Sequence, residues 1–455
     1  NLIAKLFLIG MSLWFYGYAG LDGLKWLLIS MAANYAIVLL LRKFNRKSIL
    51  SIGIIINVAL LFYFKYTNFA LSSISQAAHK EYTQLDIILP VGISFFTFQQ
   101  ISYLVDSYRK ETEENTIIDY ILYVVYFPKI LMGPIVKQKD LLPQFHDSQL
   151  IHPSADNIIH GLQMFTIGLF KKVIVADTFS RAVTWAFGLG DFGQTTAMDM
   201  LLVMFAYTFQ IYFDFSGYSD MATASAMMMN ITLPINFDSP YKAYSIRDFW
   251  KRWHISLTKF LTEYIYIPLG GSRKGNVRTY LNTMIVFLVS GFWHGANWTF
   301  VLWGVLHGLF SIFDRLTDKI RKNVHPALQW GLTFLVVSVL WLLFRSESIS
   351  QWKLIMYHIC AFKNTGISDG LINSFILPET AVIIKLLHLT TLNEHVRGLW
   401  MLLFYAFAFI SCLGFENAYK RNYRNNIITS VLTALLLIFT FTCIGSQSVF
   451  VYFNF

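Results

Sequence analysis

His294 is the residue whose type and position most clearly suggest chemistry. It lies in LVSGFWHGANWTFVLWG, where no other charge-capable side chain occurs between Arg278 and His307. Sixteen residues separate Arg278 from His294, which corresponds to about 24 Å along a helix at ~1.5 Å per residue. An imidazole deep in an apolar segment is costly unless it has a chemical role or a hydrogen-bonding partner. Two interpretations stay open: a proton acceptor in a reaction, or a histidine bonded to a neighbouring helix.

A continuous helix through His294 would carry several of its neighbours on the same face. These are Phe287, Ser290, Gly291, Asn297, Trp298 and Val301. Gly291 and Gly295 would allow a substrate or another helix to approach closely. His307 is thirteen residues from His294, about 220° around such a helix. We therefore do not expect these two histidines to form one site.

His254 is the second candidate. The segment RDFWKRWHISLTKF (247–260) repeats aromatic and aliphatic residues at helical spacing, with basic residues between them. This pattern predicts an amphipathic helix in or near the cytoplasmic membrane interface. Asp248 and Arg252 are four residues apart, a spacing that supports a helix. His254 lies beside Trp253 at the edge of the apolar face, where a half-exposed interfacial histidine is the simpler interpretation.

A basic turn follows this segment. In YIYIPLGGSRKG, Pro268 and Gly270–Gly271 stop any helix and predict a re-entrant or surface turn. Arg273 and Lys274 in this turn could hold phosphate groups of a ligand. Cytoplasmic loops of membrane proteins are rich in Lys and Arg even where they bind no phosphate, so the same residues are expected without that role.

Asp214 lies in YFDFSGYSDMATASAMMMN, directly after the apolar run FQIYF. A carboxylate in such surroundings needs a partner. Ser216 and Ser219 do not form a Gly-x-Ser-x-Gly nucleophile motif. Helix capping or packing along a seam of small residues is the commoner reason for this composition.

The composition fixes the environment in which these residues work. Apolar residues make up 55% of the 455-residue chain and charged residues 14%, against about 25% charged in soluble domains. Such a chain is an integral membrane protein. The net charge of +10 follows from basic residues in short loops, so nucleic-acid binding is not expected. The three cysteines, Cys360, Cys412 and Cys443, stand singly, so no metal site and no disulfide are predicted.

Apolar runs predict roughly ten to twelve membrane spans in one domain, residues 1–455. They lie at about 2–18, 24–41, 49–64, 86–105, 117–136, 161–176, 198–216, 279–293, 298–312, 328–344, 397–415 and 426–445. Gly and Pro beside polar groups in LPVGISFFTFQQISYLVDSYR and YFPKILMGPIVKQKDLLPQF predict broken helices. The basic loops LRKFNRKS and that around Lys420, Arg421 and Arg424 are expected in the cytoplasm. The near-neutral stretch 65–85 and the C-terminal tail VFVYFNF are then expected outside.

Three segments in this order resemble the membrane-bound O-acyltransferase family: FDFSGYSDMA, FWKRWHISLTKFLTEYIYIPLGGSRKG and VSGFWHGANWTFVLWGVLHG. The similarity is to its bacterial branch of alginate, peptidoglycan and other polysaccharide O-acetyltransferase membrane subunits. It covers the whole chain, and the block 212–308 carries the catalytic motifs. The first residues resemble what is usually the second hydrophobic segment, so we expect one N-terminal span to be missing.

The resemblance implies an all-α ring of tilted helices with re-entrant segments around a central tunnel, in the bacterial cytoplasmic membrane. It implies that His294, in WHGANW, is catalytic and that His254, in RWHISL, is the second invariant position. It also implies transfer of an acetyl group from acetyl-CoA to an envelope or exported polysaccharide, directly or through an extracytoplasmic SGNH-type acyltransferase partner. No bound cofactor is expected. Our predicted substrate-binding residues are Asn297, Trp298, Trp253, Asp214, Arg273 and Lys274.

The sequence is also compatible with two other functions. D-alanyl transfer from a carrier protein to teichoic acid is another activity of the same family, although IPLGGSRKG favours the acetyl branch. A polytopic transporter or flippase would also be this apolar, but it would carry functional charges along several spans.

Overall fold

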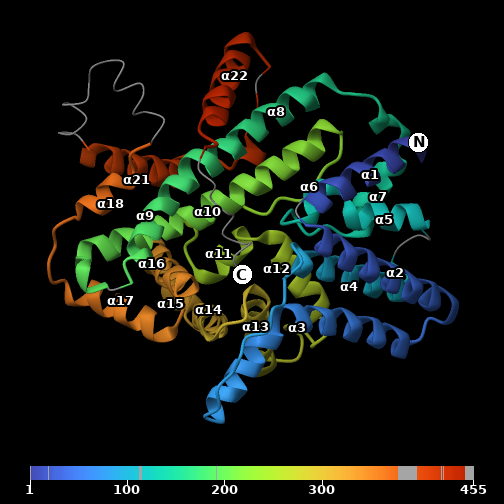
Figure 1. Cartoon of the computed structure of the whole chain (residues 1–455), viewed down its shortest axis with the longest axis horizontal. Coiled ribbons are helices and arrows are strands. Elements are labelled where there is room, and N and C mark those ends of the chain that lie inside the picture. Colours follow the sequence, from blue (N-terminus) through green and yellow to red (C-terminus); the bar gives the residue numbers. More distant parts are fainter. Residues whose placement is uncertain are drawn as a thin grey trace. The chain divides into compact units, whose positions relative to one another are not determined.

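The described part of the chain is α-helical and contains no β-strand. The computed structural model describes residues 2–18, 20–111, 115–190, 192–377, 397–421, 423 and 425–445 (Figure 1). Seven helical segments there are long and apolar enough to cross a membrane: α2 (Leu21–Phe44), α3 (Lys47–Ala77), α8–α9 (Ala155–Gly188), α10 (Ala197–Met228), α14 (Trp298–Leu316), α16 (Pro326–Arg345) and α21 (Arg397–Gly414). Two shorter apolar helices are α1 (Leu2–Tyr18) and α22 (Ile427–Thr442). The predicted all-α polytopic class is confirmed.

Contacts divide the chain into two compact units. The first contains Asn1–Leu162, Ala222–Ile235 and Lys259–Pro268, and the second contains Gln163–Met221, Asn236–Thr258 and Leu269–Phe455. Every residue that we predicted to be catalytic or substrate-binding belongs to the second unit. The site can therefore be described within one unit.

The first unit contains the two segments in which we predicted broken helices. Its further helices are α4 (Ile93–Arg109), α5 (Ile117–Val125), α6 (Phe127–Ile130), α7 (Gln138–His146), η1 (Ser148–Ile151) and η5 (Thr262–Tyr266). The chain between α3 and α4 forms no regular helix, and α4 begins only after Pro90 and Gly92. The φ of Gly92 is +73°. The next apolar run is divided at Tyr126, because Pro128 removes a backbone donor. The predicted breaks are confirmed.

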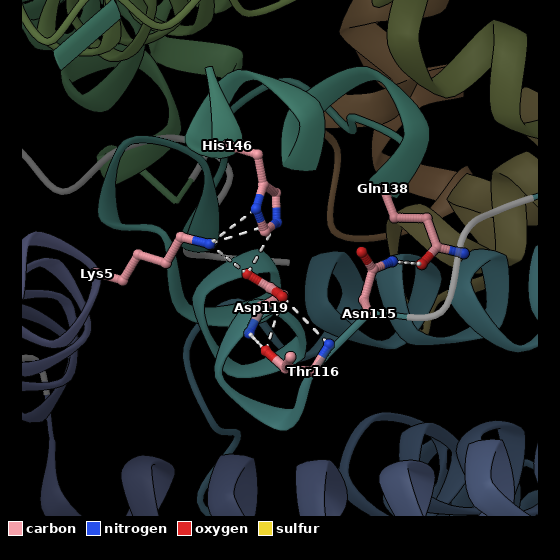
Figure 2. A network of polar contacts seen from close by, with 6 residues as sticks. All are labelled: Lys5, Asn115, Thr116, Asp119, Gln138 and His146. Carbon is pink, nitrogen blue, oxygen red and sulfur yellow. Dashed lines mark hydrogen bonds and ion pairs between the residues drawn. The ribbon is translucent and has the colours of Figure 1, made fainter. Parts of the chain in front are cut away.

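A polar network ties three helices of the first unit together (Figure 2). Lys5 of α1 donates to Asp119 of α5 over 2.7 Å, and His146 of α7 lies 3.2 Å from the same carboxylate. Asp119 also completes a capping box with Thr116, which gives α5 a fixed start. Asp119 is the only acidic partner of the Lys5 ammonium group among the described residues, so it offsets the charge of this lysine in the apolar segment.

The second unit contains both histidine motifs, RWHISL and WHGANW, whereas residues 259–268 of the longest family-like segment belong to the first unit. Besides the spans above, the elements of the second unit are η2 (Lys171–Ala176), η3 (Phe192–Gln194), η4 (Pro240–Lys242), α11 (Ile246–Arg252), α13 (Asn276–His294), α15 (Asp318–Arg321), α17 (Ile349–Ala361), α18 (Asp369–Asn373) and η6 (Ala418–Lys420). Helix α12 (Ile255–Leu261) begins in this unit, and α8 (Ala155–Phe170) ends in it. The tail from residue 446 and Arg424 lie outside the described residues.

Candidate active site

A tight helical hairpin places His294 at the end of α13 and not in the middle of a longer helix. The backbone becomes extended at Gly295, with φ at −169°, and α14 begins at Trp298. The Asn297 side chain accepts from the Thr299 amide at 3.0 Å and caps the new helix. The expectation that Asn297 and Trp298 share a helical face with His294 is therefore wrong. Glycine is required at position 295 for a steric reason, because the Phe300 ring fills the space that a side chain there would need.

Aromatic rings enclose His294, whose residue surface is only 3% exposed. Its imidazole lies 4.9 Å from the ring of Trp293, 5.1 Å from Trp303 and 5.3 Å from Phe344, measured between centroids. Trp303 also contacts the imidazole of His307 at 4.6 Å. The hairpin thus brings both histidines to one tryptophan, although a single helix would have turned them apart.

His254 lies in a break between α11 and α12 and not on an amphipathic interfacial helix. Its φ is +44°, a left-handed conformation that ends α11, and the residue is fully buried. The prediction of a half-exposed histidine is wrong because protein covers the apolar face of this segment, including Trp253 and Leu257, both 0% exposed. Burial lowers the pKa of His254 to about 3, so the imidazole is neutral at physiological pH. The predicted pairing of Asp248 with Arg252 is present at 3.0 Å.

Trp293 connects the two histidine motifs. Its ring lies 6.0 Å from His254 and 4.9 Å from His294. Phe215 of α10 covers another side of His254 at 4.8 Å. Two imidazoles from segments forty residues apart in sequence therefore share one aromatic enclosure.

Asn236, which no sequence pattern distinguishes, holds the break at His254. Its carbonyl accepts from the Ile255 amide at 2.9 Å, and its side-chain oxygen accepts from the Ser256 hydroxyl at 2.6 Å. Its amide donates to Ser219 over 3.4 Å. The motif FSGYSD is thereby joined to the motif RWHISL through one asparagine. Only the contacts reveal this role, because Asn236 stands in a segment without helical periodicity.

The tryptophans around the break belong to the packed interior. Trp253 lies 4.8 Å from Trp341 and 5.0 Å from Phe237, which makes it a core residue beside His254. The indole of Trp250 donates to Nδ1 of His307 over 3.1 Å. This bond joins α11 to α14 and fixes the proton of neutral His307 on Nε2.

Asp214 has the partner that its apolar surroundings require. Lys172 of η2 lies 2.6 Å from Asp214 and 2.9 Å from Asp177. Next to it, Lys171 pairs with Asp220 at 2.6 Å. The prediction that Asp214 needs a partner is confirmed, and the pairing gives it a role in joining η2 to α10.

The remaining predicted residues occupy exposed or helix-capping positions. Arg273 and Lys274 are exposed in the turn before α13, which has 19 residues and is therefore about 28 Å long. They lie near the opposite end of α13 from His294. Trp298 is 53% exposed, and the Asn297 amide donates to the Glu347 carbonyl at 2.8 Å. The structure brings His294 and His254 to the same ring, that of Trp293, and Trp253 lies in the core next to His254. Arg273, Lys274 and Trp298 are exposed.

Comparison with known proteins identifies the family of the chain. Residues 8–346 match the membrane-bound O-acyltransferase family. Over its full length the chain is 35% identical to a peptidoglycan O-acetyltransferase of Helicobacter pylori, covering 92% of that protein. It is 39% identical to a probable alginate O-acetylase of Azotobacter vinelandii, over 67% of this chain and 61% of that protein. A teichoic acid D-alanyltransferase of Streptococcus thermophilus is 27% identical over 52% of this chain and 59% of its own length.

An all-α, multi-pass architecture with these motifs defines a class, the membrane-embedded acyl-transfer enzymes. The chain belongs to the membrane-bound O-acyltransferase family and is an O-acyltransferase. The transporter alternative is thereby set aside.

Proposed function

We propose that the chain transfers an acetyl group from acetyl-CoA, made in the cytoplasm, to hydroxyl groups of a cell-envelope polysaccharide. The similarity to a peptidoglycan O-acetyltransferase carries the proposal, because it spans the whole chain and therefore the residues of both histidine motifs. An acyl thioester is available in the cytoplasm, whereas envelope polymers are completed outside the cytoplasmic membrane. An enzyme embedded in that membrane removes the need to export the donor.

In this proposal His294 is the general base. The neutral imidazole accepts the proton of the attacking hydroxyl while the new C–O bond forms at the thioester carbonyl. The C–S bond then breaks, and the leaving thiolate takes the proton from the imidazolium. Such assistance is typically worth about 10²–10⁴-fold in rate. The aromatic enclosure supports this role because it excludes water. A base that was open to water would activate a water molecule, which would hydrolyse the thioester.

His254 serves as a second site residue. Its burial keeps it neutral, so it can donate one hydrogen bond or accept one without adding charge. Trp293 contacts both imidazoles, which supports a shared function for the two motifs.

Arg273 and Lys274 are the proposed contacts for the donor's phosphates. Both are exposed and lie about the length of α13 from His294. A donor that reaches from the basic turn to His294 must be extended, with its phosphates at Arg273 and Lys274 and its thioester near the histidine. These contacts would be charge-assisted hydrogen bonds.

The acceptor side has two forms in this proposal. Acetyl passes straight to a sugar hydroxyl, or first to the serine of an extracytoplasmic SGNH-type acyltransferase that modifies the polymer. In both forms the attacking group is a hydroxyl, so the chemistry at His294 is the same.

A donor competition tests the proposal. Purified protein in lipid vesicles, with an SGNH-type partner or polysaccharide fragments outside, should transfer label from acetyl-CoA and not from a D-alanyl carrier protein. The D-alanyl alternative draws on the similarity to D-alanyltransferases and predicts the opposite preference.

The donor-side residues have a test of their own. The double substitution Arg273→Gln with Lys274→Gln should raise KM for acetyl-CoA more than it lowers kcat. An unchanged KM in the correctly inserted double variant would remove these residues from the donor site.

A further inference from the structure

Trp303 presents a buried hydrogen-bond donor that the packing leaves unused. The residue is 0% exposed and lies in α14, one helix of the hairpin that carries His294. Among the described residues its indole Nε1 has no hydrogen-bond partner. Its ring meets the imidazole of His294 at 5.1 Å and 84°, an edge-to-face contact.

The surroundings explain why the donor stays unused. The rings that touch Trp303 are those of Trp250, His294, His307, Trp341 and Phe344. Aromatic carbon offers no strong acceptor, and Nδ1 of His307 already accepts from Trp250. Buried tryptophan N–H groups usually have a partner, and leaving one without a partner costs about 1–3 kcal/mol. A ligand oxygen entering this enclosure would recover that free energy.

We propose that the indole N–H of Trp303 donates a hydrogen bond to the carbonyl oxygen of the acyl group during transfer, as an oxyanion donor beside His294. The inference rests on the proposed acyl transfer at His294 and adds a catalytic residue to it. The ligand class is the thioester carbonyl and the tetrahedral oxyanion that it becomes.

The relative position of the two groups suits one carbonyl. A general base lies about 2.6–3.2 Å from the attacking oxygen, and an oxyanion donor lies about 2.7–3.1 Å from the oxygen that gains charge. The base and the donor must therefore lie side by side, one at the attacking oxygen and the other at the carbonyl oxygen. The edge-to-face rings of His294 and Trp303 are neighbours of this kind. Asn297 is less suitable, since its side-chain oxygen accepts from Thr299 and its amide donates to Glu347.

The step balances with the groups present. As the hydroxyl oxygen bonds to the carbonyl carbon, its proton moves to His294 and the π-electron pair of the carbonyl moves onto oxygen. Trp303 stabilises that negative charge and keeps its own proton. When the carbonyl re-forms, the C–S bond breaks and the thiolate takes the proton from His294.

Replacing Trp303 with Phe tests the inference, because it removes the N–H and keeps an aromatic ring. We expect kcat to fall about 10²–10³-fold, the usual loss for one oxyanion donor, with a much smaller change in KM. Trp330→Phe in α16 is the control. The indole N–H of Trp330 donates to the Tyr241 carbonyl over 2.8 Å, and its ring stacks on Phe334 with centroids 5.8 Å apart. The control also removes one indole N–H, so it should lower the thermal midpoint and leave kcat unchanged.

A second substitution tests the inference if the Trp303→Phe protein does not fold. Benzothienylalanine at position 303 replaces the N–H by sulfur in a bicyclic ring of almost the same shape, and it should give the same loss of kcat. Near wild-type kcat in either folded variant, with His294→Gln inactive in the same assay, would overturn the inference and leave the proposed function intact. A wild-type protein that transfers no acetyl group would instead contradict the proposed function.

Discussion

At the scale of single residues, Lys172 and the two carboxylates beside it account for one another's burial. Lys172 contacts two carboxylates, Asp214 at 2.6 Å and Asp177 at 2.9 Å. Its side chain and those of both partners are less than a tenth exposed. Asp214 therefore needs no substrate to explain it. Its proximity to the FSGYSD motif reflects how η2 is joined to α10.

The shared lysine predicts an asymmetry between two substitutions. Lys172→Met removes the cation that both buried carboxylates contact, and removing one partner of a buried pair costs about 3–5 kcal/mol. Asp214→Asn leaves Lys172 paired with Asp177, so it should cost only about 1–3 kcal/mol. Thermal midpoints in detergent should therefore fall more for Lys172→Met, while folded Asp214→Asn keeps its activity. A stable but inactive Asp214→Asn protein would return Asp214 to the substrate site.

At the scale of elements, the α13–α14 hairpin sets the position of His294. A Cβ atom added at Gly291 would lie 2.5 Å from the Phe300 carbonyl oxygen, and one added at Gly304 would lie 2.5 Å from that of Phe287. The two backbones can approach this closely only because both positions are glycine. His294 follows Gly291 by one helical turn, so the spacing of the hairpin decides where the imidazole lies.

A single methyl group should disturb this spacing. Gly291→Ala forces the helices apart and should cost about 1–3 kcal/mol of stability, as overpacking does. It should also lower kcat strongly, because a shift of ~1 Å in a catalytic group can cost about 10²-fold. Gly331→Ala in α16 is the control, since nothing lies within 4 Å of the added Cβ. Wild-type turnover in Gly291→Ala would show that the hairpin tolerates separation.

At the scale of the whole molecule, the sequence predicts long elements better than it predicts breaks. Composition alone identifies a membrane protein, and the predicted span 328–344 corresponds to α16. The breaks at Pro128 and Gly92 could be predicted because proline and glycine cause them. The break at His254 could not, because a left-handed histidine leaves the helical pattern of RDFWKRWHISLTKF unchanged. It depends on Asn236, whose contacts with Ile255 and Ser256 exist only in the folded chain.

The orientation of the molecule follows from loop charge and has a direct test. Helix α3 has 31 residues, about 46 Å at ~1.5 Å per residue, enough to cross ~30 Å of hydrocarbon and continue beyond it. With the exposed Cys360 replaced by serine, a cysteine at Arg46 should react with an impermeant reagent only from the cytoplasmic side. One at Glu81 should react only from outside. Labelling of both positions from the same side would contradict the orientation.

The central claim, that His294 is the base of an acyl transfer, is tested most directly by comparing His294→Gln with His294→Ala. Glutamine keeps a polar side chain that can satisfy a structural partner, but it cannot take a proton near neutral pH, whereas an imidazole with a pKa near ~6.5 can. The measurement is the turnover of labelled acetyl-CoA by purified, monodisperse protein whose thermal midpoint matches wild type. We predict that both variants fold and that neither transfers acetyl. A folded His294→Gln protein with near-normal turnover would contradict the claim and leave His294 a structural residue.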